Sequence, residues 1–537
     1  MIYLKDYSKL EECISEEINK ESSLLQSIYK ETGDSEERVD RFAKLIDGVS
    51  QSDILVLDEN DCAAKEPFKI VTQGNKGEYW TQQYIGLLQI TSDGTKEEVF
   101  IRSRFDVNES CEFSKYMLNK ALGLKANILQ KVEPSVGRGE ILDLILAIIF
   151  AIQIARAYRK GIYRRYRTYE NNDSKLKGRI DVARHIRLNP IFNGNIAYSS
   201  REYTADNDMN RMILTAYTSL QKRQPGLMRE LEKKYTPVKD FISQLKNIMQ
   251  PASRQEARKL VQKERKKITH AVYSDWESVR KTAILILKYM GIAPEDDGTN
   301  VSGILINMNY IWERYLVQIV KEKIENKYQI EGKKLFETFF CPGQKPKKLY
   351  PDLVISDKNG PLLIIDAKYK NEWENVASNK SDKTERERED CFQIMSYMYR
   401  AKCKFGGIFC PQTKVQDDGK KSLKEYSIFD APDEKAPDEK ATDEKAIVTL
   451  FSLQINGIQG SSKEFAEEME KREDALCGEI LKKIETHEEL RNQEMKKIKD
   501  MAVFMNTNGM EVKKIAYYLN ESASRIQEWI EESSIVQ

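Results

Sequence analysis

Apolar and polar residues alternate along the chain in two patterns, one typical of helices and the other of strands. Residues 1–50 carry apolar side chains at helical spacing, whereas 51–106 contains short β-rich runs punctuated by Gly and Asp. These patterns predict a helical segment followed by several strands. Helical spacing returns over 112–160 and 207–295, the latter with strongly charged faces. The mixture predicts an α+β fold.

The pattern changes after residue 300. An amphipathic helix is predicted over 308–325, and β-type runs follow it as far as the strand-like segment 446–455. Three five-residue repeats (APDEK, APDEK and ATDEK) occupy 431–445. Their proline and alternating charge predict a solvated loop inserted within this part of the chain.

The C-terminal part is predicted to be helical, with a charged helix over 461–500 and two short helices over 510–531. The short pair has helix-turn-helix-like spacing, but residues 461–537 hold 12 Lys or Arg against 17 Asp or Glu. Acidic charge argues against DNA binding, so we expect a helical pair that packs or binds a partner. Three regions are therefore predicted: residues 1–300, 301–460 and 461–537.

Composition narrows the possible functions. The 537 residues include 86 Lys and Arg against 85 Asp and Glu, and a net charge of +1 excludes nucleic-acid binding by bulk charge, so only a local patch could serve. The eight cysteines form no C-x-x-C pair and there are three histidines, which argues for reduced, buried thiols and against zinc. The apolar run 141–155 is short and contains Asp143, so we expect a buried helix in a cytoplasmic protein without a membrane partner.

Candidate chemistry lies in two apolar runs that flank Asn359-Gly360, a hairpin signal. With the turn centred on Asn359, Asp352 would lie opposite Asp366, with Cβ atoms roughly 4.5–5.5 Å apart. Lys368 is two residues beyond Asp366 and would project from the same face. A strict two-residue turn or one bulge would shift this register, so the pairing is a geometric prediction.

Two carboxylates and a lysine in this arrangement suit metal-dependent hydrolysis of phosphodiesters. Asp352 and Asp366 could hold Mg²⁺, with Mn²⁺ as a substitute, and Lys368 could position or help deprotonate the attacking water. The spacing P-D-x(13)-D-x-K resembles the core of PD-(D/E)XK nucleases, which implies a restriction-endonuclease-like domain over 301–460. The alternative is a surface hairpin with two solvated acids.

Two flanking helices add candidate residues. Glu313 lies at the edge of the apolar face of 308–325, where it would either complete the metal shell or be a solvated boundary glutamate. Gln393 and Tyr397 are four residues apart and share one helix face. They resemble the Q-x-x-x-Y motif of RecB-like nucleases, in which the pair contacts the site and the DNA. The order of these elements favours a nuclease over a decorative hairpin.

A basic segment, 156–190, holds eleven Lys or Arg against three acidic residues, with four tyrosines interleaved. It could bind DNA phosphates, dock on an acidic partner, or form a cationic, solvated helix face. Charge alone does not distinguish these three possibilities.

Several segments together resemble McrC, the nuclease subunit of McrBC-type restriction systems. The resemblance covers roughly residues 80–455, and it fails at Phe100 to Arg104, at the 431–445 insert and after about residue 460. The segments that carry it are Tyr84-Ile85-Gly86, a predicted helix over 148–166, Leu176 to Asp181, Arg201 to Arg211, Asp366 to Lys370 and Gln393 to Tyr397.

This resemblance implies a Mg²⁺-dependent endonuclease subunit of a type IV-like system that cuts double-stranded DNA carrying modified cytosine. Such a subunit docks on a McrB-like AAA+ GTPase hexamer, inserts a finger into its pore and stimulates GTP hydrolysis. Residues 156–190 would be the finger, with Arg179 and Asp181 as docking candidates. The chain has no GxxxxGK[ST] loop, so the GTPase would be a separate chain.

The resulting prediction is an α+β protein with a partner-docking N-terminal region, a PD-(D/E)XK domain and a helical C-terminal tail. Two alternatives remain open. One is an autonomous PD-(D/E)XK nuclease that needs no motor, and the other is a catalytically idle scaffold that only activates a GTPase. The presence of both acids and the lysine argues against the idle scaffold.

Overall fold

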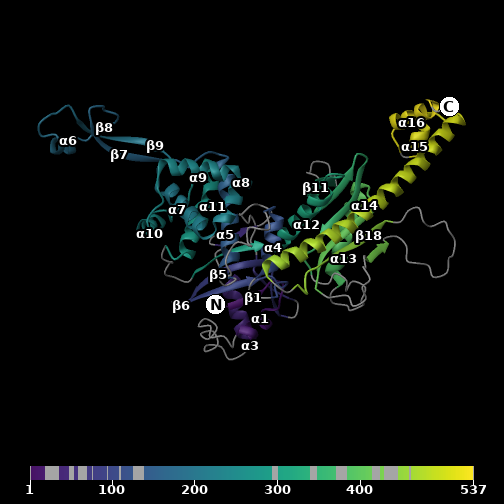
Figure 1. Cartoon of the computed structure of the whole chain (residues 1–537), viewed down its shortest axis with the longest axis horizontal. Helices are drawn as coiled ribbons and strands as arrows, with labels where there is room; N and C mark the ends of the chain where they lie inside the picture. Colours follow the sequence, from purple (N-terminus) through teal and green to yellow (C-terminus); the bar gives the residue numbers. More distant parts are fainter. Residues whose placement is uncertain are drawn as a thin grey trace. The chain divides into compact units, whose positions relative to one another are not determined.

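The computed structural model describes most of the chain (Figure 1). The contacts between residues separate the chain into two compact units. Unit 1 comprises Met1–Ile311 with Gly460–Ala466, and unit 2 comprises Trp312–Gln459 with Glu467–Gln537. The predicted loop at 431–445 lies outside the described residues. The described residues are 2–17, 35–47, 54–57, 69–74, 77–92, 95–107, 111–124, 138–292, 300–338, 347–370, 384–413, 424–427, 446–458, 461–519 and 521–535.

A five-stranded sheet in the order β1-β6-β5-β10-β2 lies at the centre of unit 1. β5 pairs antiparallel with β6 and β10, whereas the pairs β1–β6 and β10–β2 are parallel. Side chains of α1, α3 and the β3–β4 hairpin join its core. The bounds are β1 (Ile2–Lys5), α1 (Leu10–Glu17), α3 (Ser35–Asp47), β2 (Ile54–Leu57), β3 (Val71–Gln73), β4 (Tyr79–Thr81), β5 (Tyr84–Ser92), β6 (Thr95–Arg102) and β10 (Asn300–Asn307).

Strands appear over 51–106 as the sequence predicts, but two features of this sheet differ from the prediction. Residues 1–50 do not begin as a helix, because Ile2 and Leu4 alternate into the core from the edge strand β1. β10 follows the predicted boundary at residue 300, yet every one of its residues pairs with β5. This strand therefore completes the sheet of unit 1.

Helices around α5 form a second part of unit 1. The segment Ile141–Tyr158 of α5 has a mean hydropathy of 2.0 and is long and apolar enough to span a membrane by length and composition, but 83% of it is buried. The predicted buried helix is thus confirmed, packed against α9 and α11. The bounds are α4 (Glu112–Ala121), α5 (Arg138–Tyr158), α7 (Asp208–Arg223), α8 (Pro225–Lys234), α9 (Thr236–Ile248), α10 (Arg254–Lys263), the 3₁₀ helix η3 (Ala271–Tyr273) and α11 (Asp275–Tyr289).

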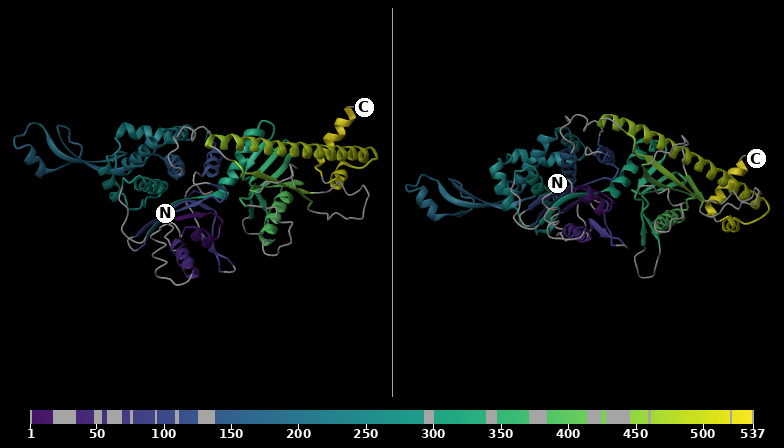
Figure 2. Two further views of the ribbon diagram at one scale, coloured as in Figure 1. Left: turned by 60° about the horizontal axis from the view of Figure 1, so that its bottom comes forward. Right: turned by 90° about the horizontal axis from the view of Figure 1, so that it is seen from below.

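A β-ribbon projects from these helices and is referred to here as the finger (Figures 1 and 2). It consists of β7 (Arg165–Asp173) and β9 (Ile196–Thr204), paired antiparallel along their whole length, with the short strand β8 (Arg179–Ile180) and α6 (Val182–Leu188) at its tip. The predicted helix over 148–166 is wrong beyond Tyr158, because Gly161 adopts a φ of +98° that a helix does not allow. Most of the basic segment is therefore not helical, although it includes the end of α5 and all of α6.

Unit 2 is built on a six-stranded mixed sheet in the order β11-β14-β15-β16-β18-β17. α13 packs on one face through Ile394, Tyr397 and Met398. The predicted strands and helices of this region are present, with β11, β13 and β17 in addition. The bounds are α12 (Met308–Ile324), β11 (Gln329–Gly332), β12 (Phe336–Thr338), β13 (Lys347–Leu349), β14 (Leu353–Asp357), β15 (Gly360–Ala367), α13 (Thr384–Ala401), β16 (Phe405–Gln412), β17 (Lys424–Ser427) and β18 (Ile447–Gln454).

A 46-residue helix, α14 (Ser462–Thr507), follows the sheet and is longer than the predicted 461–500. It packs on α12, where the Oη of Tyr315 donates a hydrogen bond to Glu473 (2.5 Å). The predicted pair of short helices is present as α15 (Val512–Leu519) and α16 (Ala523–Ile535). These two helices form a small core with the end of α14, around Ile515 and Ile526.

Gly86 lies where β10 packs closely against β5, which gives a test of the unit 1 sheet. Its φ is +142°, and a Cβ there would lie 2.0 Å from the carbonyl oxygen of Ile304. Gly86→Ala should therefore lower the free energy of unfolding by about 3 kcal/mol or more, measured by chemical denaturation. The control is Gly478→Ala in α14, where a Cβ meets nothing within 4 Å. Equal stability of the two variants would contradict the packing described.

Candidate active site

The hairpin of β14 and β15 places the two candidate acids at one end of the unit 2 sheet. A two-residue turn joins the strands, which by itself would shift the predicted register by one residue. A bulge between Ile355 and Ser356 shifts it back, so that Leu353 pairs with Ile365. Asp352 and Asp366 follow one position beyond this pair. The turn and the bulge therefore cancel, and the predicted pairing of the acids is retained.

Asp352, Asp366 and Lys368 meet as the hairpin predicts. The Nζ of Lys368 lies 2.7 Å from Oδ2 of Asp366, which confirms that these two side chains share a face. The backbone N–H of Ala367 donates to Oδ2 of Asp352 (2.8 Å). Both acids are buried, at 6% and 1% exposure for Asp352 and Asp366, so neither is a solvated surface acid.

Gln393 and Tyr397 on α13 are joined to this group by hydrogen bonds. The Nζ of Lys368 donates to Oε1 of Gln393 (2.7 Å), and the Nε2 of Gln393 donates to the Oη of Tyr397 (2.7 Å). Both residues come from one helix face, four residues apart, as the sequence predicts. The chain of contacts from Asp366 to Tyr397 fixes where the ammonium of Lys368 points.

Glu313 reaches the acids from α12, which is held in place by its neighbour Trp312. The indole stacks on Phe409 of β16 with ring centroids 4.5 Å apart and planes within 8°, and its Nε1 donates to the carbonyl oxygen of Phe409 (3.3 Å). The same carbonyl accepts from the backbone N–H of Lys368 (2.8 Å). One backbone oxygen thus links α12, with Glu313, to the strand end that carries Lys368.

Three charged residues of the site were not predicted. Lys333, just after β11, lies with Nζ 2.7 Å from Oε2 of Glu313 and 3.4 Å from Oδ1 of Asp352. Asp390 is buried on α13 and contacts Lys368 (3.3 Å) and Lys370 (2.6 Å). Asp390 and Lys370 stand beside the recognised motifs, at Asp390-Cys391-Phe392-Gln393 and Asp366-Ala367-Lys368-Tyr369-Lys370, but Lys333 has no local signal in the sequence.

Burial and mutual repulsion raise the pKa values of the two acids. For Asp352, burial and then the carboxylate of Glu313 raise the pKa to about 6. For Asp366, burial and then the carboxylate of Asp352 raise the pKa to about 7. Glu313, Asp352 and Asp366 are therefore neighbours whose negative charges repel one another, and a cation bound among them would relieve this repulsion.

The ammonium of Lys368 is the positive partner of this group. Burial lowers the pKa of Lys368, but the carboxylates of Asp366 and Asp390 outweigh that effect, so the pKa lies above the ordinary lysine value. The side chain is then a hydrogen-bond donor at neutral pH and has no lone pair to accept a proton. In this state Lys368 can donate a hydrogen bond to a water molecule.

The donor set fits a hard divalent cation, because Glu313, Asp352 and Asp366 offer carboxylate oxygens, which Mg²⁺ prefers. Within the described ranges, no three carboxylate, thiol or imidazole groups converge tightly enough to hold an ion as the side chains stand. Ion pairs account for this arrangement, since Lys333 holds Glu313 and Asp352 while Lys368 holds Asp366.

The partner-docking candidates lie on the finger, far along the chain from the acids. Arg179 is exposed on β8. Asp181 is the N-cap of α6, where its carboxylate accepts from the backbone N–H of Arg184 (3.0 Å). Arg184 is buried and donates to the carbonyl oxygens of Asn171 and Tyr198. Asp181 therefore has at least a structural role in the finger tip.

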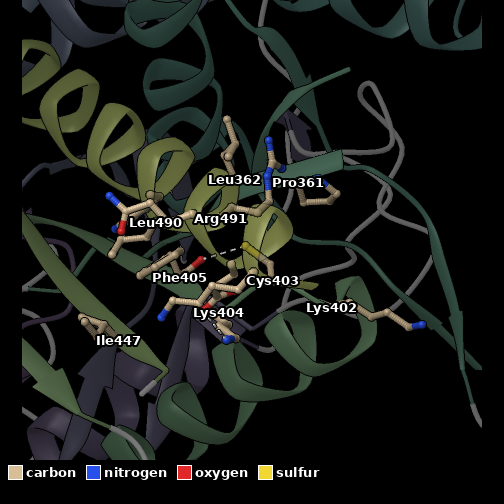
Figure 3. Close-up of a pocket in the computed structure, with 13 residues that line it drawn as sticks. Pro361, Leu362, Lys402, Cys403, Lys404, Phe405, Ile447, Leu490 and Arg491 are labelled. Atoms are coloured by element: carbon tan, nitrogen blue, oxygen red, sulfur yellow. Dashed lines mark hydrogen bonds and ion pairs between the residues drawn. The ribbon is translucent and has the colours of Figure 1, made fainter. Parts of the chain in front are cut away.

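A cavity of about 280 Å³ opens at the other end of β15, between the sheet and α14 (Figure 3). Pro361, Leu362, Cys403, Phe405 and Arg491 are among the residues that line it. None of the carboxylates that contact Lys333 or Lys368 lines this cavity. It is therefore separate from the candidate site.

Comparison with known protein families identifies the family of this chain. The sequence profile described as McrBC 5-methylcytosine restriction system component matches residues 80–410, more than half of the chain. The chain belongs to the McrBC family. This match confirms the resemblance to an McrBC-type restriction system that the sequence motifs predict. The matched range includes the finger, both acids, Lys368, Gln393 and Tyr397.

Two solved structures are similar to this McrBC-family chain. A half-complex from the tetradecameric assembly of Thermococcus gammatolerans McrB AAA+ hexamers with bound McrC is 15% identical, with a TM-score of 0.37 and coverage of 88% of this chain and 99% of that chain. The T. gammatolerans McrBC complex is 16% identical, with a TM-score of 0.25 and coverage of 61% and 89%. No curated protein matches the chain.

The raised pKa of Asp366 predicts how stability depends on pH in metal-free buffer. The carboxyl titrates near 3.9 in an unfolded chain and at about 7 in the folded protein, so folded stability falls as pH rises between these values. Asn cannot ionise. Asp366→Asn should therefore raise the melting temperature by at least about 2 °C at pH 8.

The same series of thermal unfolding scans, run in EDTA from pH 4 to 8, contains its own control. At pH 4 the wild-type carboxyl is protonated in the folded state, so the two proteins should melt at nearly the same temperature. A difference that grows toward low pH would contradict the assignment of a raised pKa to Asp366.

Proposed function

We propose that this chain is the Mg²⁺-dependent DNA endonuclease subunit of a modification-dependent, type IV-like McrBC restriction system. The observation that carries the nuclease activity is the buried group of Asp352, Asp366 and Lys368, joined by Glu313 from α12 and by Gln393 from α13. On this proposal, unit 2 contains a PD-(D/E)XK domain. Membership of the McrBC family supports the restriction system as the setting.

In this mechanism Asp352, Asp366 and Glu313 would hold the metal ion. When bound, Mg²⁺ would polarise the scissile phosphate and stabilise the charge that develops on it. Lys368, as an ammonium, orients the attacking water from the side of Asp366. Gln393 accepts a hydrogen bond from Lys368 and so keeps that ammonium directed at the reacting face, while Tyr397 holds the amide of Gln393.

The partner in this proposal is a separate McrB-like AAA+ GTPase hexamer, and the substrate is double-stranded DNA that carries modified cytosine. The finger supports a docking role because its tip carries several exposed apolar side chains beside its basic residues. Ile191 is 84% exposed, Phe192 67%, Ile186 65% and Val182 62%. Water-exposed apolar side chains grouped on a projecting ribbon suit insertion into a protein pore better than contact with phosphates.

The cysteines support the proposed cytoplasmic location. All six that fall within the described residues are free thiols, and five of them are buried. Free, buried thiols are usual in a reducing compartment. Mg²⁺ is the abundant hard cation there, and Mn²⁺ would be an effective substitute because it accepts the same oxygen ligands.

Two alternatives differ in what they require of these residues. An autonomous nuclease would cut without nucleotide and would leave the exposed tip of the finger unexplained. An idle scaffold would stimulate a GTPase without needing the buried acids. Burying carboxylates that repel one another lowers the stability of the fold, and a scaffold would have no function that compensates for this loss. The combination of site and finger favours the motor-coupled nuclease.

Cleavage of methylated DNA tests the nuclease assignment. Protein purified with its partner should cut in the presence of Mg²⁺ and GTP but not with ATP or without nucleotide. Asp366→Ala should reduce cleavage by at least about 1,000-fold, because it removes a ligand of the proposed metal, while GTP hydrolysis persists. Wild-type cleavage by this variant would overturn the site, and equal cutting without nucleotide would favour the autonomous nuclease.

The finger tip provides a separate test of docking. Ile191→Ser with Phe192→Ser should lower stimulation of the partner's GTPase at least about tenfold, because exposed apolar residues at an interface are frequent hot spots. Tyr517→Ser on α15 is the matched control, since Tyr517 is 83% exposed but lies outside the finger. Thermal unfolding should be unchanged in both variants. Equal loss of stimulation in the control would contradict docking through the finger.

A further inference from the structure

The ammonium of Lys333 occupies the space between two of the three carboxylates assigned to the metal. It lies 2.7 Å from Oε2 of Glu313 and 3.4 Å from Oδ1 of Asp352. The side chains of the two acids are only 16% and 8% exposed, whereas that of Lys333 is 39% exposed. The contact therefore joins two largely buried anions to a cation that borders on water.

The backbone holds Lys333 at this position. Its φ of +54° is in the left-handed region, which non-glycine residues rarely adopt, and its N–H donates to the carbonyl oxygen of Asp352 (3.3 Å). The preceding Gly332 packs on α12, where a Cβ would lie 3.1 Å from Val317. The Cα of Lys333 is thus fixed beside Asp352, so any displacement of the ammonium has to come from rotations within its long side chain.

An ammonium placed between two carboxylates competes with a divalent cation for the same space, because the two positive charges repel one another there. Mg²⁺ requires its oxygen ligands at about 2.0–2.1 Å in near-octahedral geometry, so the pair Glu313–Asp352 has to turn from Lys333 toward the ion. The ammonium can leave without breaking the core, because the side chain already borders on water. Its departure takes one positive charge away while the ion brings two.

We propose that Lys333 is a resident counter-cation of the metal site, which neutralises Glu313 and Asp352 in the metal-free protein and is displaced when a divalent cation binds. This inference rests on the proposed function, since it requires a metal at these carboxylates. Lys333 then acts as a positioning residue that sets how tightly the ion is held. It keeps the carboxylates in place before loading and competes with the ion for them.

The test compares Mn²⁺ affinity in the full chain, measured by the paramagnetic signal of free Mn²⁺, for wild type and Lys333→Met. Removing the competing cation should tighten Mn²⁺ binding about 10- to 100-fold, the range of a charged hydrogen bond. Lys334→Met is the matched control, because the ammonium of Lys334 pairs with Glu331. Its affinity should stay within about twofold of wild type.

A second readout separates this role from a merely structural one. Without metal, Lys333→Met should melt at a lower temperature than wild type, because two nearly buried carboxylates lose their partner, and saturating Mn²⁺ should abolish the difference. Lys333→Arg keeps the cation and should retain near-wild-type affinity. If Lys333→Met fails to fold, Lys333→Gln should bind Mn²⁺ more tightly in the same way. Unchanged or weaker Mn²⁺ binding by the neutral variants would overturn the inference.

Failure of the inference and failure of the proposed function give different results. If wild type binds Mn²⁺ and Asp366→Asn does not, the metal site stands and the neutral variants of Lys333 decide the inference alone. If wild type does not bind Mn²⁺, or if Asp366→Asn binds it equally well, there is no metal site at these carboxylates. Both the proposed function and the role of Lys333 are then wrong.

Discussion

Repulsion between buried carboxylates is the constraint on which the site depends. Glu313, Asp352 and Asp366 come from a helix and two strand ends, and burial raises the pKa of both aspartates. Compensating cations stabilise such a group, and Lys333 and Lys368 provide them. Carboxylates that need a cation to stay charged are also good ligands for a metal, so the same repulsion links stability to function.

The scaffold around this group explains why the side chains stay close. The carbonyl oxygen of Phe409 accepts hydrogen bonds from Trp312 and from the backbone of Lys368, which ties α12 to the strand end. α13, which packs on a face of the sheet, adds Gln393 and Asp390 around the ammonium of Lys368. The charged groups are thus held by helices and strands. A site can orient a water molecule and a phosphate only if its side chains are held rigidly in this way.

Sequence reasoning succeeds where spacing alone decides the geometry. Asp352 and Asp366 come together because a hairpin has a fixed period, although the bulge that restores their register has no recognisable sequence signal. Lys333 could not be found in this way, since its position depends on a left-handed residue after a short strand and on the packing of α12. The resemblance to McrC placed the finger at about 156–190, whereas the ribbon runs from Arg165 to Thr204, and the predicted helix over 148–166 was carried too far because Gly161 ends it locally.

The central claim is that the carboxylates at the end of the hairpin bind a divalent metal. The most direct measurement is anomalous scattering from a crystal of the protein soaked in Mn²⁺. The account predicts a peak within roughly 2.0–2.6 Å of carboxylate oxygens of Asp352 and Asp366, with the side chain of Lys333 turned away from Glu313. A saturated soak with peaks only elsewhere, and Lys333 still paired with Glu313, would contradict it.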